Sequence, residues 1–256
     1  MNSIFSGLIS SIPQMLLSLP AIFISLSVHE ASHGYMAYKL GDPTAKNLGR
    51  LTLNPLKHID PIGFICMFLF GIGWANPVPV NSRYFKKPRR DMALTAAAGP
   101  LSNLCLAVIF TLLLRLLMIP IDAKYSDSFQ FVENKFYYSA SLMDDKLFWI
   151  LAILVCILYF GIVLNLSLML FNLIPLPPLD GSRIAYIFMP SKWYFGIMKY
   201  EKYIMIGFLV LLYLGVLTLP INFLSTWILT GLFKATVMPY DLVQSIISLL
   251  FSRFTI

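Results

Sequence analysis

The chain has 256 residues, of which 58% are hydrophobic and only 12% are charged. A soluble globular domain is about one quarter charged, so the composition excludes an ordinary soluble domain and indicates a polytopic membrane protein. The net charge of +7 fits Lys and Arg in cytoplasmic loops better than nucleic-acid binding, which we do not expect. The length suits a single membrane-embedded domain, residues 1–256, with about five or six spans.

The first firm span is predicted at 12–37, and polar residues interrupt the end of this apolar run. The interruption is Val28-His29-Glu30-Ala31-Ser32-His33-Gly34. Because residues four apart share one face of a helix, His29 and His33 can ligate one metal ion. Glu30 lies beside them and can act as general base toward a metal-bound water. Ionisable side chains are costly in an apolar helix, which favours a functional site over an accidental pattern.

The segment that follows, 38–60, is rich in Gly and Pro and contains a possible short strand at 50–53. Its histidine, His58, is interpreted as a loop residue with satisfied polar contacts rather than a metal ligand. The apolar stretch 61–75 would cover only about 22 Å as a helix, against a membrane core of about 30 Å. We therefore expect a small β or re-entrant element between the first two firm spans, and an extended, proline-rich stretch at 76–81.

Further spans are predicted at 92–118, 147–173 and 203–219, with one or two more toward the C-terminus. The second of the firm spans opens with small residues, which suit close helix contact. The predicted all-α fold thus has a core at about 12–190, in which three transmembrane helices carry the metal site, and C-terminal membrane helices at about 203–256.

Charged residues predict the orientation of these spans. Lys and Arg cluster at 83–90 and 183–202, whereas acidic residues cluster at 120–146. The positive-inside rule places the two basic clusters in the cytoplasm and the acidic loop outside. His29, His33 and Asp180 then lie at the same depth, near the cytoplasmic face.

Two histidines leave a tetrahedral catalytic zinc ion one protein ligand short, with water in the fourth position. Asp180 is the outstanding candidate, because irregular backbone at membrane depth survives only where it is buried or lines a wet cavity. The alternatives for Asp180 are a helix N-cap and a partner for Arg183. Asn172 is interpreted either as a hydrogen bond between helices or as a donor to the oxyanion formed when water attacks a carbonyl. Asn103 has the same two interpretations, and the structural one is favoured.

Two segments carry a resemblance to a known family. They are His29-Glu30-Ala31-Ser32-His33-Gly34 and Asn172-Leu173-Ile174-Pro175-Leu176-Pro177-Pro178-Leu179-Asp180-Gly181. They resemble the two signatures of the site-2 protease family of intramembrane zinc metalloproteases, and 54–63 and 99–103 resemble its small prokaryotic branch. The resemblance covers about 20–190. Unlike the fuller family pattern, this sequence shows no PDZ-like soluble insertion.

The resemblance implies a role for each matched residue. His29, His33 and Asp180 would be ligands of one zinc ion per chain, Glu30 the base, and Asn172 a helper at the transition state. It also implies a β-containing, partly membrane-inserted stretch at about 42–82 that guides the substrate.

We therefore expect a zinc metalloendopeptidase of the cell membrane that hydrolyses peptide bonds in or near transmembrane segments of membrane proteins, with its active site toward the cytoplasm. Its partners would be a transmembrane protein substrate and the lipid bilayer, and the sequence predicts no oligomeric state. One alternative is a transporter or ion pathway that uses His29, His33 and Asp180, against which the lack of an internal repeat with paired broken helices argues. The other is a non-catalytic scaffold of the same fold, although all the proposed catalytic groups are present.

Overall fold

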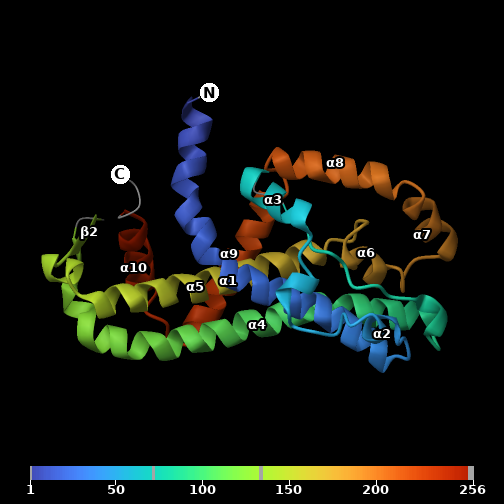
Figure 1. Cartoon of the computed structure of the whole chain (residues 1–256), viewed down its shortest axis with the longest axis horizontal. Coiled ribbons are helices and arrows are strands. Elements are labelled where there is room, and N and C mark those ends of the chain that lie inside the picture. Colours follow the sequence, from blue (N-terminus) through green and yellow to red (C-terminus); the bar gives the residue numbers. More distant parts are fainter. Residues whose placement is uncertain (1, 71–72, 133–134, 253–256) are drawn as a thin grey trace. The chain divides into compact units, whose positions relative to one another are not determined.

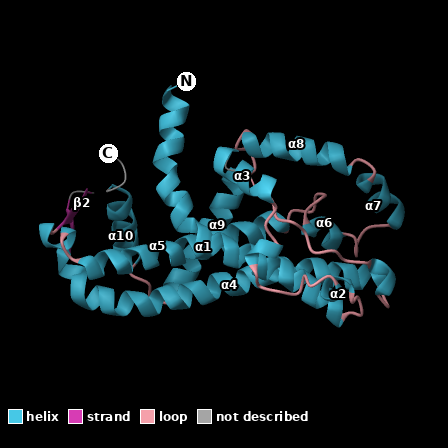
Figure 2. Ribbon diagram, viewed as in Figure 1, coloured by secondary structure: helices cyan, strands magenta, loops and turns pink. Residues whose placement is uncertain are grey.

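The computed structural model describes residues 2–70, 73–132 and 135–252, most of which are helical (Figures 1 and 2). Within these described residues, three helices are long and apolar enough to cross a membrane. They are α1 (Asn2–Lys39, with the span at Met15–Lys39), α4 (Pro88–Tyr125) and α5 (Lys146–Asn172). They correspond to the three firm spans predicted at 12–37, 92–118 and 147–173. With about 1.5 Å per residue, even α5 covers about 40 Å, which exceeds a membrane core of about 30 Å.

Shorter elements connect these three helices and follow the last of them. Those between α1 and α4 are α2 (Thr44–Asn47), η1 (Pro55–Lys57), α3 (Pro61–Phe70) and η2 (Ser82–Tyr84). Those between α4 and α5 are η3 (Ser126–Ser128), an antiparallel hairpin of β1 (Phe129–Val132) and β2 (Lys135–Tyr138), and η4 (Ala140–Met143). Those after α5 are α6 (Asp180–Ala185), α7 (Ser191–Met198), α8 (Glu201–Tyr213), α9 (Thr218–Ala235) and α10 (Tyr240–Ser252).

The chain divides into two compact units, and helices α1, α4, α5 and α9 each contribute to both. The first unit comprises 1–22, 107–163 and 229–256. Its core includes the fully buried Leu114 and Ile246, and a hydrogen bond of 3.0 Å from Gln244 Nε2 to Tyr159 Oη joins α10 to α5. The second unit comprises 23–106 and 164–228 and contains every residue proposed above for the site.

The predicted strand at 50–53 is wrong. Within the described part of 42–82, backbone pairing of the β type is limited to an isolated antiparallel bridge between Ile59 and Ala75. The reason lies in how the chain satisfies its polar groups. The Arg50 guanidinium donates to the carbonyl oxygens of Asn76 and Pro77, so a side chain takes the place of a strand partner. Prolines in the opposing segment 77–80 also lack the N–H that a ladder requires.

Helix α3 begins where the short apolar element was predicted. Its 10 residues cover about 15 Å, which is well short of a membrane core. This length agrees with the prediction that 61–75 is no clean span, although residues 71–72 lie outside the described part. Whether α3 re-enters the membrane stays a prediction.

The predicted fourth span at 203–219 is also wrong, because it is not one helix. Helix α8 ends at Tyr213, and α9 begins only at Thr218. Gly215 between them has φ +75°, a left-handed conformation that glycine adopts without steric cost and that commonly ends helices. Helices α8 to α10 are not among the three described helices long and apolar enough to cross a membrane, and their membrane role stays a prediction.

Candidate metal centre

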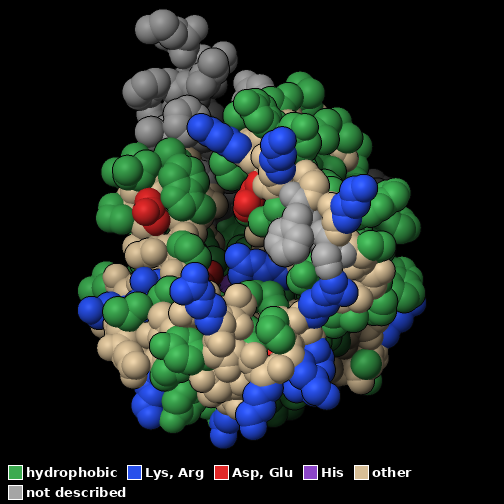
Figure 3. Space-filling model, turned by 90° about the vertical axis from the view of Figure 1, so that its right-hand side faces the viewer, with side chains coloured by type: hydrophobic (Ala, Val, Ile, Leu, Met, Phe, Trp, Pro, Cys, Tyr) green, Lys and Arg blue, Asp and Glu red, His purple; other side chains and the backbone are tan. Residues whose placement is uncertain are grey.

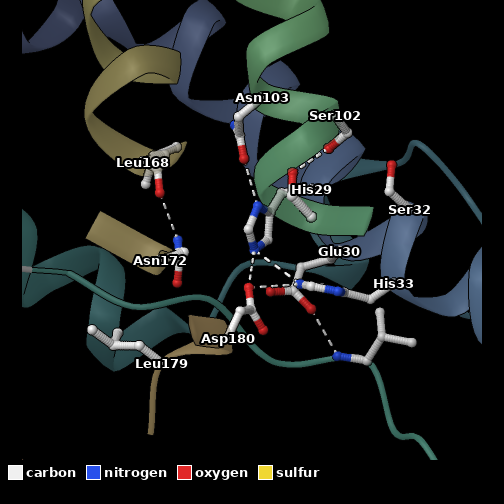
Figure 4. A network of polar contacts seen from close by, with 12 residues as sticks. His29, Glu30, Ser32, His33, Ser102, Asn103, Leu168, Asn172, Leu179 and Asp180 are labelled. Atoms are coloured by element: carbon white, nitrogen blue, oxygen red, sulfur yellow. Dashed lines mark hydrogen bonds and ion pairs between the residues drawn. The ribbon is translucent and has the colours of Figure 1, made fainter. Parts of the chain in front are cut away.

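The structure brings His29, His33 and Asp180 together (Figure 4). The two histidines project from one face of α1, and Asp180 is the first residue of α6. The Nε2 atoms of the two histidines lie 3.0 Å apart. Asp180 Oδ2 lies 3.3 Å from His29 Nε2 and 3.2 Å from His33 Nε2. All three side chains are largely buried, so a ligand bound between them would be shielded from bulk solvent.

The local sequence explains how Asp180 reaches this position. The backbone after α5 is irregular, and the first turn of α6 packs against the chain that directly follows α5. A Cβ on Gly181 would collide with the carbonyl groups of Leu173 and Ile174, so only glycine permits this approach. The N-cap of α6 is Leu179, and the Asp180 carboxylate contacts the two histidines. Its position therefore agrees with the ligand interpretation better than with helix capping.

The three side chains fit a tetrahedral zinc ion. Bonds of about 2.0–2.1 Å place two ligand atoms of such an ion about 3.3 Å apart, close to the observed separations of 3.0 to 3.3 Å. Two imidazoles and a carboxylate are also a donor set that zinc prefers. Among the described residues, no hydrogen-bond donor other than these imidazoles reaches the buried Asp180 Oδ2.

Contacts with His29 and His33 favour the ionised form of the Asp180 carboxyl. Burial has the largest single effect and acts to raise its pKa, but hydrogen bonds and positive charge from His29 and His33, when these are protonated, together outweigh it. The pKa of Asp180 therefore lies below the usual value for an aspartate.

Each imidazole is oriented from its far side by an oxygen acceptor on α4. His33 Nδ1 lies 2.7 Å from the carbonyl oxygen of Thr95, and His29 Nδ1 contacts Asn103 Oδ1. A carbonyl oxygen can only accept, so His33 carries a proton on Nδ1, which in the neutral ring leaves the Nε2 lone pair facing Asp180. Sequence reasoning missed Thr95 because its backbone, not its side chain, makes this contact.

Gly99 on α4 packs against the rings of both His29 and His33. A Cβ at this position would lie 2.6 Å from His29 Cε1 and would also collide with the His33 ring. The rings therefore pack directly on the α4 backbone. The run of small residues at the start of α4 indicated a close approach by another helix. It did not indicate that two histidine rings would be the groups packed there.

Glu30 lies on α1 between the two histidines in sequence and is 9% exposed. Its Oε2 accepts a hydrogen bond of 2.9 Å from the backbone N–H of Val78 (Figure 4). The segment around Val78 is anchored in turn, because Asn76 N donates to His58 O and Arg50 donates to Asn76 O. The Val78 N–H is thus committed to Glu30 and is not free to pair with an extended substrate.

Asn172 and His58 lie outside this group of ligands. Asn172 ends α5, and its Nδ2 donates to the Leu168 carbonyl at 3.0 Å (Figure 4). His58 is fully buried in its loop, with Nε2 2.8 Å from the Thr52 carbonyl oxygen. The structure therefore joins neither of them to the contacts between His29, His33 and Asp180.

The sequence profile described as Peptidase family M50 matches residues 18–215, which include all the residues of the site. The chain belongs to peptidase family M50.

Among individual proteins, the chain is similar to a Bacillus subtilis protein named "Putative zinc metalloprotease YwhC", to which it is 43% identical over 203 residues, covering 79% of this chain and 81% of the relative. The chain is also similar to two proteins named "Putative zinc metalloprotease Rip2". The one from Mycolicibacterium smegmatis is 27% identical over 68% of this chain. The one from Mycobacterium tuberculosis (strain Erdman) is 31% identical over 62% of this chain. These matches span 57% and 51% of the two Rip2 proteins. No solved structure matches the chain significantly.

Proposed function

We propose that this chain is an intramembrane zinc metalloprotease that hydrolyses peptide bonds in or near transmembrane segments of membrane proteins. The observation that carries the proposal is the convergence of two histidines and an aspartate, with separations of 3.0 to 3.3 Å, on and beside helices long enough to cross a membrane. Membership of peptidase family M50 and the zinc metalloprotease names of the relatives support it.

His29, His33 and Asp180 would hold one zinc ion per chain through Nε2, Nε2 and Oδ2. When bound, the ion would polarise the scissile carbonyl and lower the pKa of the attacking water. The buried position of the three side chains would keep bulk water away from a substrate placed against them.

Glu30 is the general base of the proposed mechanism. Because Val78 N–H occupies Glu30 Oε2, Oε1 is the oxygen assigned to take a proton from the attacking water. The same carboxyl then gives that proton to the leaving amine nitrogen as the peptide C–N bond breaks. Asn172 would exchange its bond with Leu168 for one to the oxyanion that forms on the substrate carbonyl.

The proposed location is the cell membrane, with several spans and the site toward the cytoplasm. Lys and Arg side chains outnumber acidic ones on the face shown in Figure 3, as the positive-inside rule requires of a cytoplasmic surface. The substrate would be a transmembrane protein, and the segment 42–82 would guide it toward the site.

The decisive test is metal-dependent proteolysis by the purified full chain. We expect stoichiometric zinc, cleavage of a model transmembrane substrate, loss of cleavage with a chelator, and recovery when zinc is added back. Asp180→Ala should bind less zinc and should not cleave. A transporter would instead show metal or proton flux in liposomes without peptidase activity, and a scaffold would show neither activity.

A further inference from the structure

A second polar cluster lies behind the metal centre, on the side of His29 that faces away from Asp180. It consists of Ser25 on α1, Asn103 on α4 and Asn165 on α5, each with a relative exposure of 0%. Asn103 Oδ1 contacts His29 Nδ1, so the cluster touches a proposed ligand directly. None of the roles assigned above to the metal ligands or to Glu30 uses Asn165 or Ser25.

The hydrogen bonds of this cluster run in one direction. Asn165 Nδ2 donates to Ser25 Oγ at 2.7 Å, which leaves Asn165 Oδ1 to face Asn103. Asn103 Nδ2 donates to that oxygen at 2.7 Å, which turns Asn103 Oδ1 toward His29. An amide oxygen accepts and cannot donate, so His29 Nδ1 must be the donor of the last bond. The neutral imidazole then carries its lone pair on Nε2, the atom that faces His33 and Asp180.

The reverse order of the same contacts would be incompatible with a metal at this site. If the Asn103 amide nitrogen faced His29, the histidine would have to accept at Nδ1 and carry its proton on Nε2. That proton would occupy the position a metal ion needs. The direction of the amides, and not only their presence, therefore decides whether His29 can be a ligand.

Resting on the proposed function, we infer that Asn103 and Asn165 form a relay that positions His29 for zinc, with Ser25 as its anchor on α1. Asn103 Oδ1 accepts the hydrogen bond from His29 Nδ1 and so fixes the orientation and the tautomer of the ring. Asn165 Oδ1 accepts from Asn103 Nδ2 and so fixes the orientation of the Asn103 amide. The relay also joins three membrane-spanning helices through buried side chains, so the position of His29 depends on how α4 and α5 pack against α1. Asn103 and Asn165 are positioning residues, because they would act on the metal only through His29.

The relay is tested by zinc affinity, measured by competition with a chromophoric chelator on the full chain in detergent. Asn103→Leu removes the acceptor while keeping the number and branching of the side-chain heavy atoms, and it should weaken zinc binding about 10- to 100-fold, the usual loss when a partner of a metal-ligating histidine is removed. Asn103→Asp keeps an oxygen acceptor for His29 Nδ1 and should stay close to the unsubstituted chain. Cobalt bound to Asn103→Leu should show an altered visible absorption spectrum, whereas cobalt bound to Asn103→Asp should not.

Two further variants separate the relay from general packing. Asn165→Leu should also weaken zinc binding, and the double variant Asn103→Leu/Asn165→Leu should be no weaker than Asn103→Leu alone, because both changes act through one histidine. Thr111→Val is the matched control. It removes a buried side-chain hydrogen bond to Ala107 from the same helix, away from the metal centre, and should leave zinc affinity unchanged.

Equal losses in Asn103→Leu and Asn103→Asp, or unchanged affinity and cobalt spectrum in Asn103→Leu, would overturn the relay. If Asn103→Leu does not fold, unchanged zinc affinity in Asn165→Leu overturns it and a weakened affinity supports it. Failure of the unsubstituted chain to bind zinc would contradict the proposed function itself as well as the relay. Normal zinc binding that these variants do not alter would contradict only the relay.

Discussion

At the scale of single residues, the site depends on atoms that lie behind the ligands as much as on the ligands. His33 is held by the Thr95 carbonyl, His29 by Asn103, and both rings lie on the backbone of Gly99. A ligand set whose members are fixed before the metal arrives loses less conformational entropy when it binds. Substitutions of the residues that contact these rings should therefore lower the affinity for the metal.

Gly99→Ala tests this directly. The added Cβ would lie within 2.6 Å of His29 Cε1 and would also collide with the His33 ring, so one or both rings must move. We expect zinc affinity to fall by at least about 10-fold, a loss comparable to that from disturbing a ligand's supporting contacts. The control is Gly196→Ala in α7, where a Cβ would meet no atom within 4 Å. Zinc titration of both variants should show a loss in the first alone, and equal affinities would mean that the rings do not need Gly99.

The proposed metal ligands could be selected from the sequence, and Asn103 could be noted as a possible contact between helices. The contact of Asn103 with His29 and the position of Asn165 beside it could not be predicted. His29 and His33 are four residues apart on one helix, and Asp180 is an acidic residue on a break after an apolar run, so each could be recognised locally. Asn165 lies inside an apolar span, and its role depends on Asn103 on another helix. No spacing rule joins residues that are 62 positions apart.

At the scale of elements, the long apolar helices and the start of the short helix α3 were predictable, whereas the strand at 50–53 and the span at 203–219 were predicted wrongly. Helices α1, α4 and α5 follow from length and hydropathy alone. The strand predicted at 50–53 failed because the Arg50 side chain takes the carbonyl groups that a second strand would use. The span predicted at 203–219 failed because a single glycine turns the chain between α8 and α9.

Alanine substitutions at two glycines, one in the turn between α8 and α9 and one inside α8, should change the stability of the protein in opposite directions. Gly215→Ala places a Cβ at φ +75° and should destabilise the protein by about 1–2 kcal/mol. Gly207→Ala lies inside α8, where a Cβ would meet no atom within 4 Å, and should stabilise it by about 0.5–1 kcal/mol. Thermal unfolding in detergent should move the two midpoints in opposite directions. A continuous helix through 203–219 would instead make both substitutions stabilising.

At the scale of the whole molecule, the proposed orientation in the membrane follows from charge and not from the coordinates. Basic residues at 83–90 and 183–202 argue that these segments are cytoplasmic, and the acidic segment between α4 and α5 would then be outside. The structure adds that the candidate metal centre joins α1 to α6, which contains Arg183, the first residue of the basic segment 183–202.

Labelling of intact cells tests that orientation. In a chain whose three native cysteines are replaced, Ser141→Cys should react with a membrane-impermeant thiol reagent added outside. Lys192→Cys, which is also on an exposed residue, should react only after the membrane is permeabilised. The reverse pattern would place the basic segments and the metal centre on the outer side.

The central claim is that Glu30 acts as base beside a zinc ion held by His29, His33 and Asp180. The most direct measurement compares the purified chain with Glu30→Gln, which keeps the size and the acceptor for Val78 N–H but cannot take a proton. Both proteins should contain equal zinc, and Glu30→Gln should cleave a model transmembrane substrate about 100- to 10,000-fold more slowly. Cleavage at the unsubstituted rate by zinc-loaded Glu30→Gln would contradict the account.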